Sequence, residues 1–158
     1  MGTTDEINSA SPDCVIVSIR NFAYSRELVF NAWTDPNRLK NWWGPKGFTN
    51  TFHEFDLRPG GKWSFIMHGP DGVNYPNESI FVAIIEPELI VLNHITNPKF
   101  QIVATFEELV EDNTKVTFRM IFETPELCSQ VKFYAVEKNE ENFDRLEAEL
   151  RKNDFLYV

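Results

Sequence analysis

The hydrophobic period of the chain changes several times, and each change predicts a different kind of element. Residues 14–20, CVIVSIR, alternate and are rich in β-branched side chains. They predict a first strand with Val15, Val17 and Ile19 on one side. Two short helices are predicted next. Ser25 can cap RELVFNAW, and Asp35-Pro36 supplies a cap and a first-turn proline for a second helix ending at Trp43.

From residue 50 the period is two. The segments TFHEFDL and KWSFIMH flank RPGG (58–61), whose proline and glycines suit a hairpin turn, and GPDG (69–72) predicts the next turn. Four further strands are predicted, at NESIFVAIIE, LIVLNHI, FQIVATFEEL and KVTFRMIFE. Short connections between successive strands predict an antiparallel meander.

After Thr124-Pro125 the period becomes helical and continues to about Lys152. The predicted apolar stripe is large at both ends but small or polar at Ala135 and Asn139. The middle of this helix therefore cannot fill the space beneath a curved sheet, and a cavity is expected there. The stripe consists of Leu127, Val131, Ala135, Asn139, Phe143, Leu146 and Leu150.

Strand alternation identifies the side chains that face this helix. Trp63, Phe65 and Met67 share one face of their strand, which we place inward. These side chains are expected to form the core first, and to line a pocket only where the helix stripe is thin. The same alternation places inward Phe100, Ile102, Ala104 and Phe106 on one strand, and Val116, Phe118, Met120 and Phe122 on another.

The adjacent tryptophans in LKNWWGPKGF point in different directions, because neighbouring helical residues are about 100° apart. If Leu39 is a core contact, Trp42 and Trp43 straddle the inward edge and one ring turns toward the pocket mouth. The alternative is that both rings are ordinary core. Gly44 followed by proline ends the helix, and Gly47 lets the chain turn into the sheet.

Composition limits the partners. The 158-residue chain carries a net charge of −9, which repels nucleic acids and anionic membranes. It has no long apolar segment and no signal-peptide pattern, so a cytoplasmic protein is expected. Residues 1–13 are predicted to be a disordered tail and 14–158 a single domain. Cys14 and Cys128 are isolated and are expected to be buried thiols.

The titratable residues indicate no definite catalytic centre. His53, His68 and His94 fall on three different strands without metal-ligand spacing, so they are expected to be scattered or hydrogen-bonded; no metal or cofactor is predicted. Glu54 and Asp56 share a strand face and could provide an acid or base, but a solvated face before a turn is the simpler interpretation. No catalytic residue is assigned.

Four motifs carry a resemblance to a known family: ELVFNAWTDPNRLKNWWGPKGF, DLRPGGKWSFIMHGPDG, TKVTFRMIF and ENFDRLEAEL. Over residues 14–151 the chain resembles the START-related SRPBCC superfamily and, within it, stand-alone prokaryotic members of the family of activators of the heat-shock-protein-90 ATPase. The resemblance implies an α+β helix-grip fold, in which a curved antiparallel sheet of about seven strands wraps the last helix, with a ligand tunnel between them in many members. Asn139-Glu140 replaces a common Gly-Trp pair, which alters the expected pocket.

These observations favour a module that binds a small, mainly apolar molecule between sheet and terminal helix, as a monomer or a dimer. The alternatives are a cyclase- or lyase-type enzyme that uses the same cavity, and a co-chaperone that stimulates a chaperone ATPase by surface contact. The predicted ligand-binding residues are Trp42, Trp43, Phe48, Trp63, Phe65, Met67, Phe106, Phe118, Met120, Ala135 and Asn139.

Overall fold

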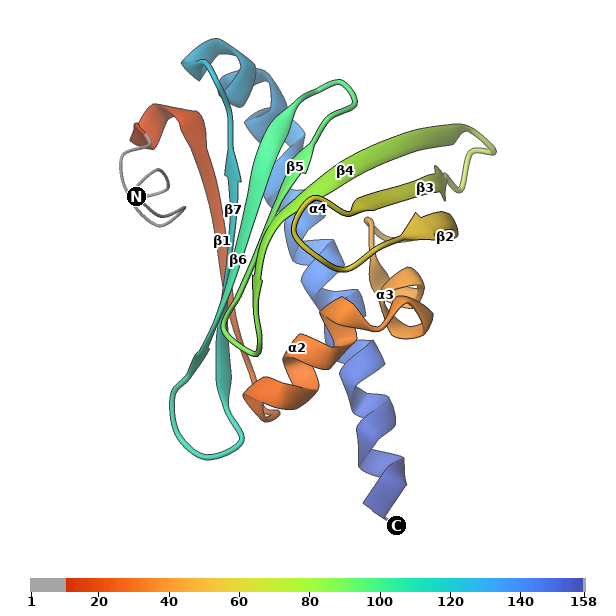
Figure 1. Cartoon of the computed structure of the whole chain (residues 1–158), viewed down its shortest axis with the longest axis vertical. Coiled ribbons are helices and arrows are strands. Elements are labelled where there is room, and N and C mark those ends of the chain that lie inside the picture. Colours follow the sequence, from red (N-terminus) through yellow and green to blue (C-terminus); the bar gives the residue numbers. More distant parts are fainter. Residues whose placement is uncertain (1–10, 158) are drawn as a thin grey trace.

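The computed structural model describes residues 11–157 and has the predicted order of elements. Two short helices follow the first strand, six strands come next, and a long helix ends the fold (Figure 1). The elements are η1 (Pro12–Cys14), β1 (Val15–Phe22), α2 (Arg26–Thr34), α3 (Pro36–Trp42), β2 (Thr49–Phe55), β3 (Lys62–His68), β4 (Asn74–Ile85), β5 (Leu89–His94), β6 (Phe100–Glu108), β7 (Thr114–Ile121), α4 (Pro125–Arg151) and η2 (Lys152–Tyr157).

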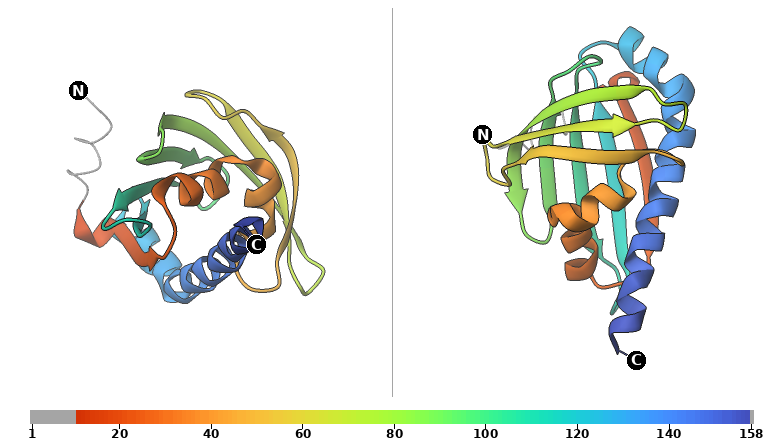
Figure 2. Two further views of the ribbon diagram at one scale, coloured as in Figure 1. Left: turned by 90° about the horizontal axis from the view of Figure 1, so that it is seen from below. Right: turned by 90° about the vertical axis from the view of Figure 1, so that its right-hand side faces the viewer.

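The seven strands form one antiparallel sheet in the order β1-β7-β6-β5-β4-β3-β2. Consecutive strands from β2 to β7 are neighbours, which confirms the meander, and β1 joins at the β7 edge. The sheet curves, and α4 lies along its open side with α2 and α3 near one end (Figure 2). This is the predicted α+β helix-grip fold.

The helix starts are set by the predicted caps. The side chain of Ser25 accepts a hydrogen bond from the Leu28 amide, and that of Asp35 accepts one from the Asn37 amide. Thr124 caps α4 in the same way. These bonds satisfy amides that have no partner within the helix. The second helix ends one residue earlier than predicted, because Trp43 already has extended backbone angles.

The first strand buries the face opposite to Val15, Val17 and Ile19. Ile16, Ser18 and Phe22 are buried, whereas Val17 and Ile19 are half exposed. Phe22 packs edge-on against Phe143 of α4, with ring centroids 5.8 Å apart, so the contact with the long helix decides which face is buried.

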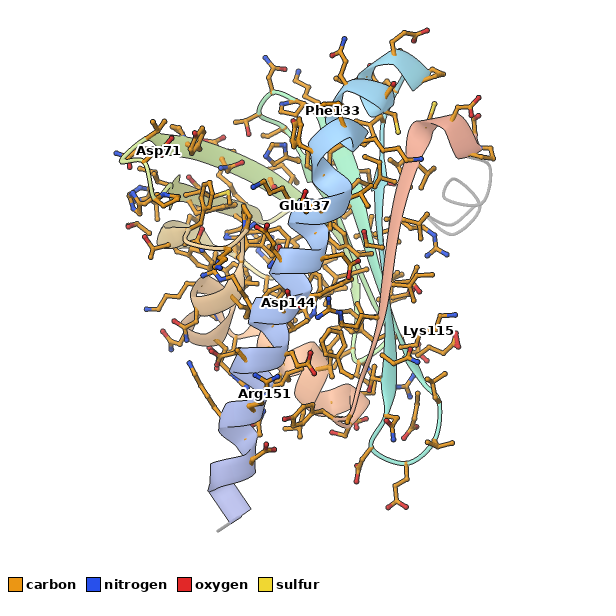
Figure 3. All side chains as sticks on the ribbon, turned by 180° about the vertical axis from the view of Figure 1, so that it is seen from behind. Asp71, Lys115, Phe133, Glu137, Asp144 and Arg151 are labelled. Carbon is orange, nitrogen blue, oxygen red and sulfur yellow. The ribbon has the colours of Figure 1, made fainter. Side chains whose placement is uncertain are left out.

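The apolar stripe of α4 is confirmed. Its buried members fix the helix over the sheet, while Leu127 and Asn139 are half-buried. Phe133 lies on the opposite face and is 93% exposed. Glu137 and Asp144 are also exposed on that side of the helix (Figure 3). The buried stripe residues are Val131, Ala135, Phe143, Leu146 and Leu150.

Most of the predicted tail, residues 1–13, falls outside the described residues, and Pro12 and Asp13 belong to η1. Cys14 and Cys128 are both free and buried, as predicted.

Truncation of Leu146 tests how far the fold depends on α4. This side chain has no exposed surface, so Leu146→Ala is expected to lower the free energy of unfolding by about 2–5 kcal/mol. The control is Phe133→Ala on the exposed face of the same helix, which should change it by less than about 0.5 kcal/mol. Urea denaturation measures both. Equal effects would show that α4 does not hold the core together.

Candidate functional site

Trp43 occupies the centre of an aromatic cluster between α3, α2 and the sheet. Its ring centroid lies 5.8 Å from that of Trp33, 5.6 Å from Trp42 and 5.1 Å from Trp63. Phe118 of β7 is 6.3 Å away on another side. Trp42 is the fully buried core ring of the adjacent pair, and Trp43 is half-buried. The second tryptophan therefore fills the space that the helix stripe leaves.

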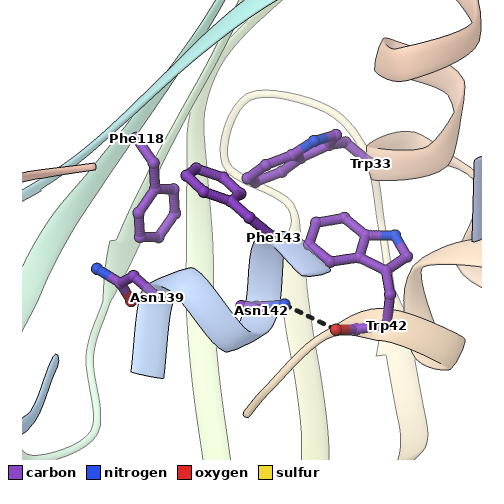
Figure 4. A pocket seen from close by; sticks show the side chains of 6 residues that line it. All are labelled: Trp33, Trp42, Phe118, Asn139, Asn142 and Phe143. Atoms are coloured by element: carbon purple, nitrogen blue, oxygen red, sulfur yellow. Dashed lines mark hydrogen bonds between the residues drawn. The ribbon is translucent and has the colours of Figure 1, made fainter. Parts of the chain in front are cut away.

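A small void lies beside this cluster, between α4, α3 and β7 (Figure 4). Its volume, counted as the space open to the centre of a water-sized sphere, is about 10 Å³. That is about the minimum needed to hold one water molecule. The void is much smaller than the cavity that the thin stripe predicts, because aromatic rings fill the space. Its lining consists of Trp33, Trp42, Phe118, Asn139, Asn142 and Phe143.

The structure brings together most of the residues predicted from the sequence. Trp42, Phe118 and Asn139 line the void. Met120 does not line the void, but its sulfur lies 3.6 Å from Nδ2 of Asn139, which does. The ring cluster that includes Trp33 and Trp43 also contains Trp63, Phe65 and Phe106.

Three predicted residues lie apart from both the void and the ring cluster. Phe48 packs against Tyr75, with ring centroids 5.9 Å apart, and Met67 is half-buried. Ala135 is buried in the core and does not line the void. Sequence reasoning missed Trp33 and Asn142 as lining residues; Asn142 stands three residues after Asn139 on α4, a spacing that could have revealed it.

Two amides on α4 give the void its polar edge. Asn139 donates a hydrogen bond from Nδ2 to the hydroxyl oxygen of Ser18, at 3.2 Å. Asn142 donates to the carbonyl oxygen of Trp42, at 2.7 Å, and its Oδ1 accepts from the amide of Gly44, at 3.3 Å. Asn142 thus ties α4 to the end of α3.

Arg145 holds the segment that carries both tryptophans. Its Nη1 donates to the carbonyl oxygens of Trp43, Gly44 and Pro45 at 3.2, 2.8 and 3.0 Å. Its Nη2 donates to those of residues 41 and 48 at 2.9 and 2.8 Å. None of the ion pairs found among residues 11–157 involves this guanidinium. Partial burial lowers the pKa of Arg145, and the carbonyls at the C-terminus of α3 supply the compensating negative potential.

Gly44 is required at the point where this segment leaves α3. Its φ is +99°, a region that other residues rarely adopt. A Cβ here would lie 2.7 Å from Cε of Met67, so a side chain would also displace a neighbour.

The titratable groups lie away from the void. Among the described residues no acid, base or histidine lines it. His68 and His94 are hydrogen-bonded, as predicted: His68 to Thr51 and Asn74 at 2.7 Å each. Glu54 is exposed on β2, as the solvated-face interpretation expects, whereas Asp56 lies just after the strand and pairs with Arg58 at 2.8 Å.

His94 is the most buried histidine and stands at the rim of the sheet. Its ring stacks on Phe100 with centroids 4.6 Å apart, and its Nδ1 lies 2.9 Å from the carbonyl oxygen of Pro98. Burial lowers its pKa, and the hydrogen bond to Pro98 partly opposes that shift. Two open clefts of about 370 and 520 Å³ adjoin this rim and share Lys99 and Glu123.

The folding pattern and the site define a helix-grip protein of the SRPBCC type. Residues 23–151 match the family described as "Activator of Hsp90 ATPase homolog 1-like protein". The chain belongs to this family, as the sequence motifs indicated.

Solved structures share the fold across most of the chain. A protein of Nitrosomonas europaea is 20% identical with a TM-score of 0.82, covering 90% of this chain and 97% of its own. One from Arthrobacter aurescens is 23% identical with a TM-score of 0.82, covering 89% and 87%. The AHSA1 protein of Silicibacter pomeroyi is 18% identical with a TM-score of 0.72, covering 88% and 99%. At these identities the likeness shows the fold alone. No functionally curated protein matches the chain, and none of the described helices could cross a membrane.

Replacement of Arg145 tests the hold of α4 on residues 41–48. Arg145→Met keeps much of the side-chain volume but removes donors from five carbonyl oxygens. We expect a loss of about 1–3 kcal/mol in the free energy of unfolding. Arg151→Met, at an exposed position of the same helix, should have little effect. Urea denaturation measures the free energy of unfolding of both variants. Equal values would contradict this role of Arg145.

Acid titration tests the environment of His94. Because its folded pKa is lowered, the unfolded chain takes up a proton first as the pH falls below about 6.5. This histidine therefore contributes stability above that pH and loses the contribution as the pH falls through its folded pKa. The free energy of unfolding should drop less between pH 7.5 and 5.5 in His94→Gln than in the wild type. An identical drop would show that His94 titrates normally.

Proposed function

We propose that the protein binds a small, mainly apolar molecule between α4 and the concave face of the sheet. The observation that carries this proposal is the void beside the Trp43 cluster, where aromatic rings and two amides meet. Ligand sites are typically apolar with a few polar groups that fix orientation. The helix-grip fold of this family commonly binds hydrophobic ligands, which supports the same reading.

The packing of α4 indicates how room could be made. Among residues 11–157, ion pairs from α4 to other elements begin at Glu140, such as Arg20 to Asp144 at 2.7 Å and Arg38 to Glu149 at 3.2 Å. Side-chain hydrogen bonds from α4 to other elements begin at Asn139. The part of α4 before Asn139 is held by apolar packing instead. The α4 residues that line the void, Asn139, Asn142 and Phe143, belong to the half held by polar contacts. A ligand is therefore expected to make room by moving aromatic rings while this half stays in place.

Binding is preferred over catalysis because of what faces the void. Proton transfer needs an acid or base within hydrogen-bond reach of the substrate. The titratable side chains of the described region lie elsewhere, so no observation favours the cyclase or lyase alternative. Stimulation of a chaperone ATPase is suggested by the family description alone, and stays a prediction.

The four indole N–H groups provide the test, because each tryptophan gives a separate side-chain signal in a ¹H–¹⁵N NMR spectrum. Titration of the full-length protein with 2-ethylnaphthalene should shift the Trp43 signal and that of at least one neighbour, in a saturable way. The signals are assigned with single Trp→Phe variants. Phe133→Ala, which removes the most exposed aromatic ring described, should bind equally well. Unchanged indole signals at saturating probe would refute interior binding.

A further inference from the structure

Unpartnered polar atoms gather around Trp43. Among residues 11–157, four buried side-chain nitrogen or oxygen atoms have no hydrogen-bond partner. Two of them are the indole nitrogens of Trp33 and Trp63, whose rings pack on Trp43, and a third is Oδ1 of Asn50, whose Nδ2 donates to the Trp43 carbonyl at 2.8 Å. Buried donors without partners are costly and rare in native proteins. Three of the four unpartnered atoms thus belong to residues that contact Trp43, which points to a functional cause.

The neighbouring Trp42 shows the contrasting case. Its Nε1 donates to the carbonyl oxygen of Ala32 at 2.9 Å, and the residue is only 1% exposed. Trp42 is therefore a satisfied core residue within the same cluster. The unpartnered state of Trp33 and Trp63 is not a general consequence of crowding among the rings.

Trp43 is the most accessible tryptophan of this cluster. It follows the last turn of α3, and its backbone is extended. Its carbonyl accepts hydrogen bonds from Asn50 and Arg145, at 2.8 and 3.2 Å, so the main chain is held independently of the ring. Trp33, Trp42 and Trp63 are buried, whereas Trp43 is half-buried and reaches the surface. Rotation of Trp43 would open a ring-sized space between Trp33 and Trp63.

We infer that Trp43 is a displaceable ring, and that the ligand replacing it is a planar apolar molecule with an oxygen acceptor for Nε1 of Trp63. This inference rests on the proposed function and specifies its ligand. Of the two unpartnered indoles, the ring of Trp63 lies nearer to that of Trp43: the ring centroids are 5.1 Å apart, against 5.8 Å for Trp33. The nitrogen of Trp33 lies on the ring edge turned away from Phe118 and Asn139 (Figure 4).

Two probes of nearly equal shape test the acceptor. 2-Methoxynaphthalene carries an ether oxygen where 2-ethylnaphthalene has a methylene group. The wild-type protein should bind the methoxy probe at least about fivefold more tightly, since a buried donor gains a partner. The indole N–H proton of Trp63 should move downfield with the methoxy probe and not with the ethyl probe, an observation that needs no substitution.

Matched variants identify the donor. Trp63→Phe should abolish the preference for the methoxy probe, because it keeps a ring but removes the N–H. Trp42→Phe removes a donor that already has a partner, and Trp33→Phe removes one on the ring edge turned away from Phe118 and Asn139 (Figure 4), so both should retain the preference. A preference that survives in Trp63→Phe, or is lost in either control, overturns the assignment to Trp63.

Removal of the movable ring tests displacement. Trp43→Ala and the milder Trp43→Leu should bind both probes more tightly than the wild type, because no ring has to be expelled. Weaker binding by the folded variants overturns the displacement. If wild-type protein binds both probes equally, interior binding stands and the inference fails. If it binds neither, the proposed function fails with it.

Discussion

The contact between Arg145 and the carbonyls of residues 41–48 is the constraint on which the rest of the site depends. This segment crosses from α3 to β2 without regular backbone pairing, and it carries the end of α3 and both adjacent tryptophans. A guanidinium with donors arranged in a fork can satisfy several carbonyls at once. Because Arg145 stands on the last helix, segments about a hundred residues apart position one another.

The two halves of α4 consequently behave differently. The second half is tied to β1, α3 and the following segment by directional polar contacts, including Arg20 over the ring of Phe143 at 5.5 Å. The first half relies on apolar packing against η1 and β1 and exposes Phe133 and Tyr134. Apolar packing resists sliding less than a set of hydrogen bonds with fixed geometry does. Any shift of α4 itself is therefore expected in the first half.

Local signals in the sequence predicted the fold well, and the site in part. Caps at Ser25 and Asp35 and the glycine turns act within a few residues, so their chemistry is readable from the sequence. Phe118 and Asn139 were found because strand and helix periods place them inward. The role of Arg145 has no such signal, since its partners are backbone carbonyls, which every residue has. The size of the void was also beyond the sequence, because it depends on how the rings pack. The sequence did not indicate which face of β1 points inward, for a similar reason. That depends on the contact of Phe22 with Phe143 of α4.

The adjacent tryptophans divide two tasks that one ring could not perform. Trp42 points into the core and uses its N–H within the protein, so its position is fixed by both packing and a hydrogen bond. Trp43 comes one residue later, beyond the end of the helix, and its ring packs on Trp33 and Trp63, whose indole nitrogens have no partner. A ring that fills space without satisfying its neighbours stabilises the empty protein less than a better-matched occupant would. If Trp43 is displaced as we infer, the same helix end provides a fixed ring at Trp42 and a replaceable ring at Trp43, with Arg145 holding the backbone after them.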